Sequence, residues 1–343
     1  SEIVARVDEK VASRIATLHE DTEASLDLVE TLKRSRQLRE RLAQDNLAVG
    51  NASPADLAKA VQARQQTIQK LQATPLLAQA RFVAARHELG PASSRVSSEE
   101  GRRRAMTLVE RAIAIDAANP DARRVAGDIF LMEDEARQAE REYRDVLKQN
   151  PNSSIDHNKL GNALMQQGDA QESAAEFKEA IRLNPSDAVS HADLGLLFRA
   201  LQDPSAAIAE FREALRVDRD FIDAHNNLAI TFARQRRLPE AAVEFREIVR
   251  IDPDSALGYY NLATVLADMD MDQESAAALR EVVRINPNHY NAHFNLGELF
   301  RLEEKFDEAV TQFGEYVRLA PDSPQNQRNI RRAKEFIQAH QNQ

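Results

Sequence analysis

Small and large apolar residues recur along this chain with a period of 34 residues, from about residue 120 to residue 323. One phase of the period always carries a small residue: Gly127, Gly161, Gly195, Ala229, Ala263 and Gly297. Three residues later the chain always carries a large apolar residue: Phe130, Leu164, Phe198, Phe232, Leu266 and Phe300. Because residues three or four positions apart lie on one side of a helix, each repeat is predicted to open with an amphipathic helix.

A second amphipathic stripe follows within each repeat. It begins with a small residue at one phase: Ala139, Ser173, Ala207, Ala241, Ser275 and Ala309. Four residues further on it carries a large one: Tyr143, Phe177, Phe211, Phe245, Leu279 and Phe313. Small residues let two helices approach closely while the large ones fill the space beside them, so this second helix is predicted to pack against the first. Five of the six repeats end at a Pro, which pushes the preceding residue out of the α region: Pro151, Pro185, Pro253, Pro287 and Pro321.

The period itself predicts how these helix pairs assemble. Units of this length bury their apolar sides only against their neighbours, which makes a stacked helical solenoid. One copy of the pattern reads His191, Leu194, Gly195, Phe198, Ala207, Phe211, Ala214 and, one repeat on, Pro253. This order resembles the tetratricopeptide repeat (TPR) family. The resemblance implies an all-α fold, a right-handed α-solenoid of about six TPR helix pairs over residues 120–323, with a concave groove that binds other proteins.

The remaining residues are also predicted to be helical. Residues 1–50 read as one long amphipathic helix with apolar residues near heptad spacing, which is typical of an imperfect coiled coil. Residues 51–119 are expected to form a helical N-terminal cap that includes a degenerate half repeat, with Ser97 as the N-cap of one of its helices. Residues 324–343 are expected to form a capping helix, since a solenoid needs a polar-faced end.

Composition narrows the class of function. The formal net charge of −10 argues against a nucleic-acid binder, whose phosphate contacts need a basic surface. The chain has no Cys, so neither disulfides nor thiolate chemistry is available. No apolar run is long enough for a membrane span or a signal-peptide core. Because the chain opens at Ser1, a removed signal or anchor stays an open alternative, and cytoplasm and cell envelope or periplasm remain equally open. Only nine of the 45 basic residues are Lys, which favours a GC-rich bacterial source.

An asparagine ladder is the strongest candidate binding feature. Asn227, Asn261 and Asn295 occupy one phase of the first helix in three consecutive repeats, with Asn226 and Asn291 nearby. By resemblance to TPR folds this helix lines the concave groove, and the column looks like the Asn ladder of the TPR region in O-GlcNAc transferases. An amide carries a donor and an acceptor, so the column could hold the backbone of an extended peptide, with Tyr260 and Phe294 as stacking or apolar contacts. The alternative is that water or the adjacent repeat satisfies these amides.

Two other patterns are interpreted as structural. His157, His191, His225 and His293 stand one per repeat, too far apart for a shared zinc ion, and are expected to act as packing residues whose protonation loosens the joints at low pH. Asp268, Asp270, Asp272 and Glu274 alternate like a calcium loop but lack its Gly and its final Glu, so they are assigned to a turn and a helix N-terminus. No metal or cofactor is expected.

Clusters of arginine leave two interpretations open. Arg102 to Arg104 and the trio Arg234, Arg236 and Arg237 are typical of solvated helix faces, but either could contact an acidic partner. No phosphate loop, nucleophile motif or metalloprotease motif occurs, so catalysis is not expected.

The sequence therefore predicts a non-enzymatic scaffold or adaptor that holds an extended or helical segment of a partner protein in its groove and self-associates or docks through its N-terminal helix. Two alternatives stay open. The chain could be a self-assembling oligomeric coat, or the targeting subunit of an enzyme encoded on another chain.

Overall fold

The structure, a computed structural model, describes residues 95–340 except residue 118, together with some isolated helical residues between 59 and 80. The long helix predicted over residues 1–50 lies outside the described residues. The chain divides into two compact units, Ser1–Leu183 and Asn184–Gln343, here called unit 1 and unit 2. Each is described by itself.

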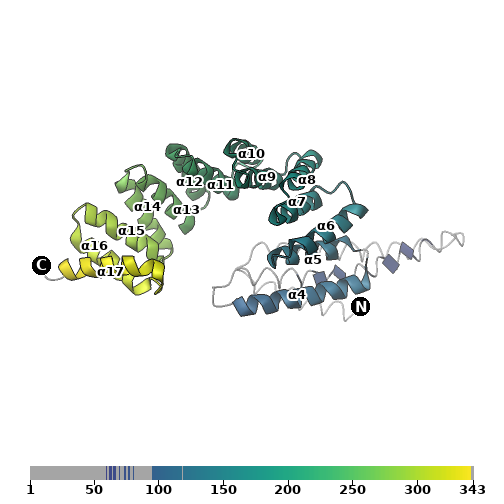
Figure 1. The fold of residues 1–343 in the computed structure, drawn as a ribbon, viewed down its shortest axis with the longest axis horizontal. Helices are drawn as coiled ribbons and strands as arrows, with labels where there is room; N and C mark the ends of the chain where they lie inside the picture. The colour runs from purple at the N-terminus through teal and green to yellow at the C-terminus, as the bar shows by residue number, and fades with distance from the viewer. Residues whose placement is uncertain are drawn as a thin grey trace, which may run out of the picture. The chain divides into compact units, whose positions relative to one another are not determined.

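All regular structure in the described residues is helical (Figure 1). Unit 1 contains α4 (Arg95–Ile115), α5 (Pro120–Met132), α6 (Ala136–Gln149), α7 (Ser154–Gln167) and α8 (Ala170–Leu183). Unit 2 contains α9 (Ala188–Ala200), α10 (Pro204–Val217), α11 (Ile222–Arg234), α12 (Leu238–Ile251), α13 (Ala256–Ala267), α14 (Asp272–Ile285), α15 (Tyr290–Leu302), α16 (Phe306–Leu319) and α17 (Pro324–His340).

Within each unit, every helix packs against the next one along the chain. The pairs α5/α6 and α7/α8 lie in unit 1, and the pairs α9/α10, α11/α12, α13/α14 and α15/α16 lie in unit 2. The predicted all-α architecture of six helix pairs is therefore confirmed. The aromatic residues predicted to fill the space between paired helices are buried, with Phe177 and Phe211 fully inaccessible to solvent.

The turn between the two helices of each pair has one backbone conformation. The residue two positions before the second helix is left-handed in all six pairs: Asp134, Gly168, Gln202, Arg236, Asp270 and Glu304. The five non-glycine residues have φ between 58° and 60°, and Gly168 has φ 88°. Side chains other than Gly, Asn and Asp pay a steric cost there, so the repeat imposes a turn that Gln202, Arg236 and Glu304 adopt against their own preference.

The two ends of the described region differ from the repeats between them. Helix α4 begins at Arg95, so Ser97 lies inside its first turn and the predicted N-cap at Ser97 is wrong. Helix α17 packs against α16 and begins 34 residues after α15, in the register of another first helix. Exposed Arg331 and Lys334 stand where the repeats carry the small and large packing residues, so this helix presents no apolar side for a second helix.

Candidate protein-binding site

The seven residues of the predicted site lie on three consecutive first helices of unit 2. Asn226 and Asn227 belong to α11, Tyr260 and Asn261 to α13, and Asn291, Phe294 and Asn295 to α15. None of them is fully buried, and Asn291 is exposed. We call the surface formed by α9, α11, α13 and α15 the first-helix face.

Polar side chains on this face link one first helix to the next. Arg199 at the end of α9 donates from Nη1 to Oδ1 of Asn227 over 2.9 Å. Asn261 donates from Nδ2 to Oδ1 of Asn226 over 3.5 Å, a long bond. Among the described residues, Asn295 has no hydrogen bond through its side chain. Contacts within the protein thus use part of the ladder. Within the part of the chain that the structure describes, its groups without a partner are the Nδ2 donor of Asn227, the Oδ1 acceptor of Asn261, and both the donor and the acceptor of Asn295.

The two aromatic residues of the predicted site already have ring neighbours. Tyr260 lies 4.7 Å from the ring centroid of His289, which caps the start of α15. Phe294 lies 5.8 Å from Phe313 and 4.9 Å from Tyr316, which places it against the core between α15 and α16. Packing within the unit therefore accounts for much of the surface of Phe294.

Helix α17 reaches the same face. Arg332 of α17 bonds Glu298 of α15 over 3.2 Å, and its guanidinium lies 5.9 Å from the ring centroid of Phe294. Glu298 also pairs with Arg301 over 3.0 Å, so its charge is shared between two guanidinium groups. At the α15 end of the first-helix face, the charges of Glu298, Arg301 and Arg332 are therefore paired with one another.

Arg199 and Arg234 lie at the other end of the face. Of the two, only Arg234 belongs to an arginine cluster that the sequence indicates as a candidate contact. Arg199 is half-buried, and burial together with the charge of Arg234 lowers the pKa of its guanidinium. Neither Arg199 nor Arg234 forms an ion pair with any carboxylate of the described residues. The predicted arginine trio is divided here, because Arg236 pairs with Asp268 and Arg237 with Glu240. One feature of the sequence could have indicated Arg199: the next two repeats carry alanine at the equivalent position.

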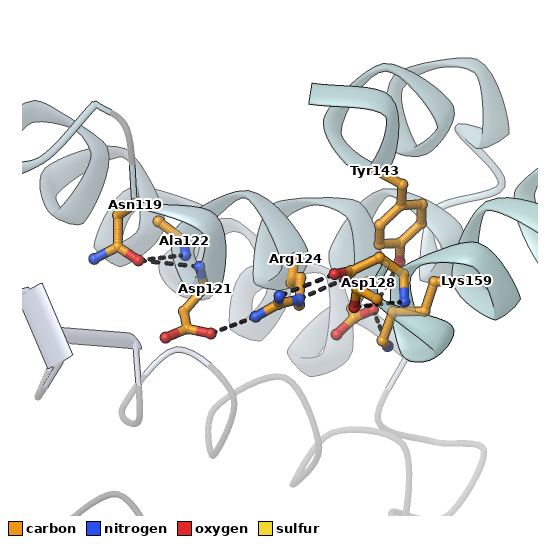
Figure 2. Close-up of polar contacts among 9 residues, drawn as sticks. Asn119, Asp121, Ala122, Arg124, Asp128, Tyr143 and Lys159 are labelled. Atoms are coloured by element: carbon orange, nitrogen blue, oxygen red, sulfur yellow. Dashed lines mark hydrogen bonds and ion pairs between the residues drawn. The ribbon is translucent and has the colours of Figure 1, made fainter. Parts of the chain in front are cut away.

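In unit 1 the first helices α5 and α7 carry a network of charged side chains that are paired with one another (Figure 2). Asp156 is fully buried and accepts from Nε of Arg124 over 2.5 Å and from Nη2 over 2.9 Å. The third nitrogen, Nη1, donates to Asp121 over 2.6 Å. The hydrogen bond to Asp156 outweighs burial and raises the pKa of Arg124.

A second part of this network lies one turn further along α5. Asp128 accepts from the hydroxyl of Tyr143 over 2.7 Å and from Nζ of Lys159 over 2.5 Å, as Figure 2 shows. Lys159 stands at the phase of the asparagine ladder, but its ammonium is neutralised within the unit. Burial first, and then the charge of Asp128, raises the pKa of Tyr143, so this hydroxyl stays protonated and donates. These residues stabilise unit 1 and leave little charge for a partner.

Three of the four repeated histidines, His157, His225 and His293, have hydrogen-bond partners at both ring nitrogens. Nδ1 of His157 lies 2.6 Å from Glu176 and Nε2 lies 2.9 Å from the carbonyl oxygen of Pro151. His225 makes the same contacts with Glu244 and the carbonyl oxygen of Arg219. Each ring therefore joins its own second helix to the end of the preceding repeat.

The protonation behaviour of two of these histidines contradicts the expected loosening at low pH. Burial alone would lower the pKa of His157 and of His225, but the carboxylate and carbonyl bonds outweigh it and raise both pKa values. Protonation therefore strengthens the joints of these two histidines, and the expected loosening is wrong for them, because the pattern of residues does not show their glutamate partners.

Other sequence patterns also resolve as structural. Asp272 and Glu274 lie in the first turn of α14, as predicted, where carboxylates interact favourably with the helix dipole. In the part of the chain that the structure describes, no group of His, Cys, Asp and Glu side chains is arranged to hold a metal ion. None of the described helices combines the length and the apolar character that a bilayer crossing demands.

Stacked helix pairs of constant period, with a polar face along their first helices, define a helical repeat protein of the interaction-scaffold class. The family model for the tetratricopeptide repeat matches residues 133–188, 192–256 and 260–324, together more than half of the 343 residues. The chain belongs to the tetratricopeptide repeat family, and its repeats form a protein-interaction scaffold.

Comparison with solved structures agrees with this fold. The C-terminal part of a TPR repeat-containing protein from Cytophaga hutchinsonii is similar with a TM-score of 0.56 and 12% identity, covering 75% of this chain and 98% of that chain. PilF of Pseudomonas aeruginosa has a TM-score of 0.47 and 20% identity over 60% of this chain and 92% of its own. YrrB, described as a TPR protein with an unusual peptide-binding site, has a TM-score of 0.45 and 18% identity over 52% of this chain and 93% of its own. No curated protein sequence matches the chain.

Proposed function

We propose that the first-helix face of unit 2 holds an extended segment of a partner protein, and that the chain itself is a non-enzymatic adaptor. The observation that carries this proposal is the amide column of Asn227, Asn261 and Asn295, which keeps hydrogen-bonding groups that the unit does not use. Amides of this kind bind backbone N–H and C=O groups of a peptide without selecting its side chains.

Spacing supports an extended rather than a helical guest. Packed helices lie about 8–10 Å apart, and an extended chain advances about 3.3 Å per residue. One amide per repeat therefore meets about every third residue of an extended peptide. A helical guest advances about 1.5 Å per residue and satisfies its own backbone groups, so it has little use for such a column.

In this proposal the rest of the chain caps the repeats and mediates self-association or docking. Residues 1–50 are proposed to self-associate or to dock, residues 51–119 to cap the first repeat, and residues 324–343 to cap the last. Two rival functions, an oligomeric coat and the targeting subunit of a separate enzyme, predict concentration-dependent assembly and co-purification with an activity, respectively.

The test is quantitative capture of partners from a native lysate by full-length protein. The variant replaces Asn227, Asn261 and Asn295 by Ala, and the control replaces exposed Asn288 and Gln273, which lie in the same unit but off the amide column. The triple variant is expected to lose most of the captured partner while its helical circular dichroism stays unchanged. Equal capture by the triple variant and the control would contradict the proposal.

A further inference from the structure

Arg199 and Arg234 differ from the arginines near the C-terminal ends of the second helices, because neither forms an ion pair with a carboxylate of the described residues. On the second helices, each exposed arginine near the C-terminal end pairs with a glutamate three residues earlier: Arg182 with Glu179, Arg216 with Glu213, Arg250 with Glu247, Arg284 with Glu281 and Arg318 with Glu315. On the first helices of unit 1, Arg124 and Lys159 are likewise paired with carboxylates. Arg199 and Arg234 have no such partner among the described residues, although they lie on adjacent helices of one face.

The surroundings of Arg199 are unfavourable for an isolated cation. Arg199 is half-buried, its side chain bonds only the neutral amide oxygen of Asn227, and the positive charge of Arg234 acts on it. Desolvation and a like charge both destabilise a cation, and a carboxylate placed between the two guanidinium groups would remove both penalties. The planar fork of a guanidinium matches the two oxygens of a carboxylate.

Asn227 completes the arrangement. Because its Oδ1 accepts the bond from Arg199, its Nδ2 group is the donor end that remains, with two N–H groups. The amide orientation follows from this hydrogen bond, since nitrogen and oxygen are otherwise hard to tell apart. Two guanidinium groups and one amide therefore all present donors, and none of them presents an acceptor.

We propose that Arg199, Arg234 and Asn227 form a binding site for the carboxylate of an Asp or Glu side chain on the segment that lies along the first-helix face. This inference rests on the proposed function and specifies the chemistry of the partner as an acidic peptide segment. The chain carries a net charge of −10, which disfavours a polyanion such as a nucleic acid, whereas a single carboxylate needs only this local pair of cations. The neutral amides of Asn226 and Asn261 on the next helices suit the peptide backbone beside it.

The test compares two fluorescent peptides of equal length, one alternating Ser and Glu and the other alternating Ser and Gln, by anisotropy with full-length protein. The glutamate peptide is expected to bind at least about ten-fold more tightly, and its affinity is expected to fall as salt is added. Equal affinity of the two peptides, or no binding of either at about millimolar protein, overturns the proposal.

A matched pair of variants locates the effect. The double variant Arg199→Gln with Arg234→Gln is expected to lose the preference for glutamate. The double variant Arg216→Gln with Arg250→Gln removes the same charge from exposed second-helix positions and is expected to keep it. Loss in both variants would show that net charge alone sets the affinity and would overturn the proposed site. Changing Arg199 and Arg234 to Glu is expected to reverse the preference toward a peptide alternating Ser and Lys.

The same peptides separate this inference from the proposed function. If the triple asparagine variant loses binding of both peptides while the arginine double variant binds them like the unaltered protein, the peptide-binding face stands and the carboxylate site fails. If the arginine variant loses the glutamate preference, while a double variant of Asn261 and Asn295 to Ala, which leaves Asn227 in place, binds both peptides like the unaltered protein, the carboxylate site stands and the ladder fails.

Discussion

Gly195 on α9 lies directly beneath the ring of Phe211 on α10. A Cβ atom added at Gly195 would stand 2.7 Å from Cε1 of Phe211 and 2.8 Å from Cδ1, closer than such atoms can pack. Phe211 is fully buried, so its ring has no free space into which to move. The close approach of the paired helices therefore depends on the absence of a side chain at this phase.

Replacing Gly195 by Ala is expected to lower the free energy of unfolding by about 1–3 kcal/mol, because the helix pair must separate slightly to admit the methyl group. Gly314→Ala is the matched control, since a Cβ there meets no atom within 4 Å and Ala favours the helix by about 0.5–1 kcal/mol. Urea unfolding checks both changes. If Gly195→Ala loses no more stability than Gly314→Ala, the ring of Phe211 can move aside for a methyl group. One repeat already carries such a pair, with Ala229 at the phase of Gly195 and Phe245 at the phase of Phe211.

Replacing Gln202 by Gly is expected to stabilise the protein. Gln202 has φ 60°, a left-handed conformation that costs a residue with a side chain about 1–2 kcal/mol. Glycine removes this cost, but it also makes the unfolded chain more flexible, which offsets part of the gain. We expect a net gain of up to about 1 kcal/mol, measured as a higher melting temperature. Gln202→Ala, which removes the same side chain without relieving the backbone, should bring no gain, and an equal gain from both would assign the effect to the side chain.

Removing the buried carboxylate of Asp156 is expected to destabilise unit 1 strongly. Asp156→Ala leaves the guanidinium of Arg124 without its bidentate partner, and breaking such a pair costs about 3 kcal/mol. The exposed pair of Arg182 and Glu179 serves as the comparison, and Arg182→Gln should cost far less, because water screens an exposed ion pair. Unfolding in denaturant measures both.

A double variant completes this test. Removing Arg124 together with Asp156, by changing both to Ala, is expected to recover a substantial part of the loss, because no uncompensated charge then stays buried. The other repeats support this expectation, since they carry small residues at the phase of Asp156: Ser190, Ala224, Gly258 and Ala292. A double variant as unstable as Asp156→Ala would mean that packing, not charge, dominates the cost.

Stability is expected to rise as the pH falls from about 8 to about 6.5, the ordinary pKa of histidine. His157 and His225 have raised pKa values in the folded protein, so the stability they contribute is fully present below that ordinary value and is lost as the pH rises through their folded values. Melting temperatures across this range, with His157 and His225 both changed to Gln, check the assignment. The variant should show a smaller rise than the unaltered protein.

His289 supplies the control for the opposite sign. Burial lowers its pKa, so its contribution is present above the ordinary pKa of histidine and is lost as the pH falls through its lower folded value. His289→Gln should therefore keep the rise between about pH 8 and about pH 6.5 and weaken the fall at lower pH. A smaller rise in the His289 variant, with an unchanged one in the double variant, would contradict both assignments.

The residue pattern was sufficient to predict the paired helices. The phases of Gly195 and Phe211 gave the first helix, the second helix and their contact, since apolar periodicity is local and is repeated in every copy. The same argument failed at the start of α4, where Ser97 does lie in a helix but the helix begins two residues earlier, at Arg95. Polar residues at helix ends mark boundaries only to within a few positions.

The asparagine column was visible in the sequence, but its hydrogen bonds were not. Asn227 receives a bond from Arg199, which lies 28 residues earlier, and Asn226 from Asn261, which lies 35 residues later. The first separation departs from the period of 34, so no alignment of the repeats with one another could indicate that contact. It arises because a long arginine side chain crosses from one helix end to the next helix.

By itself, the sequence determined the class of architecture and the family, because each repeat buries its apolar side only against its neighbours and the period records that requirement. Only the tertiary structure decided which charges are neutralised, which histidines gain a carboxylate, and that Arg199 and Arg234 gain none. The physical reason is that burial follows from a local pattern of residues, whereas the partner of a charged side chain depends on distances between helices that the pattern does not contain.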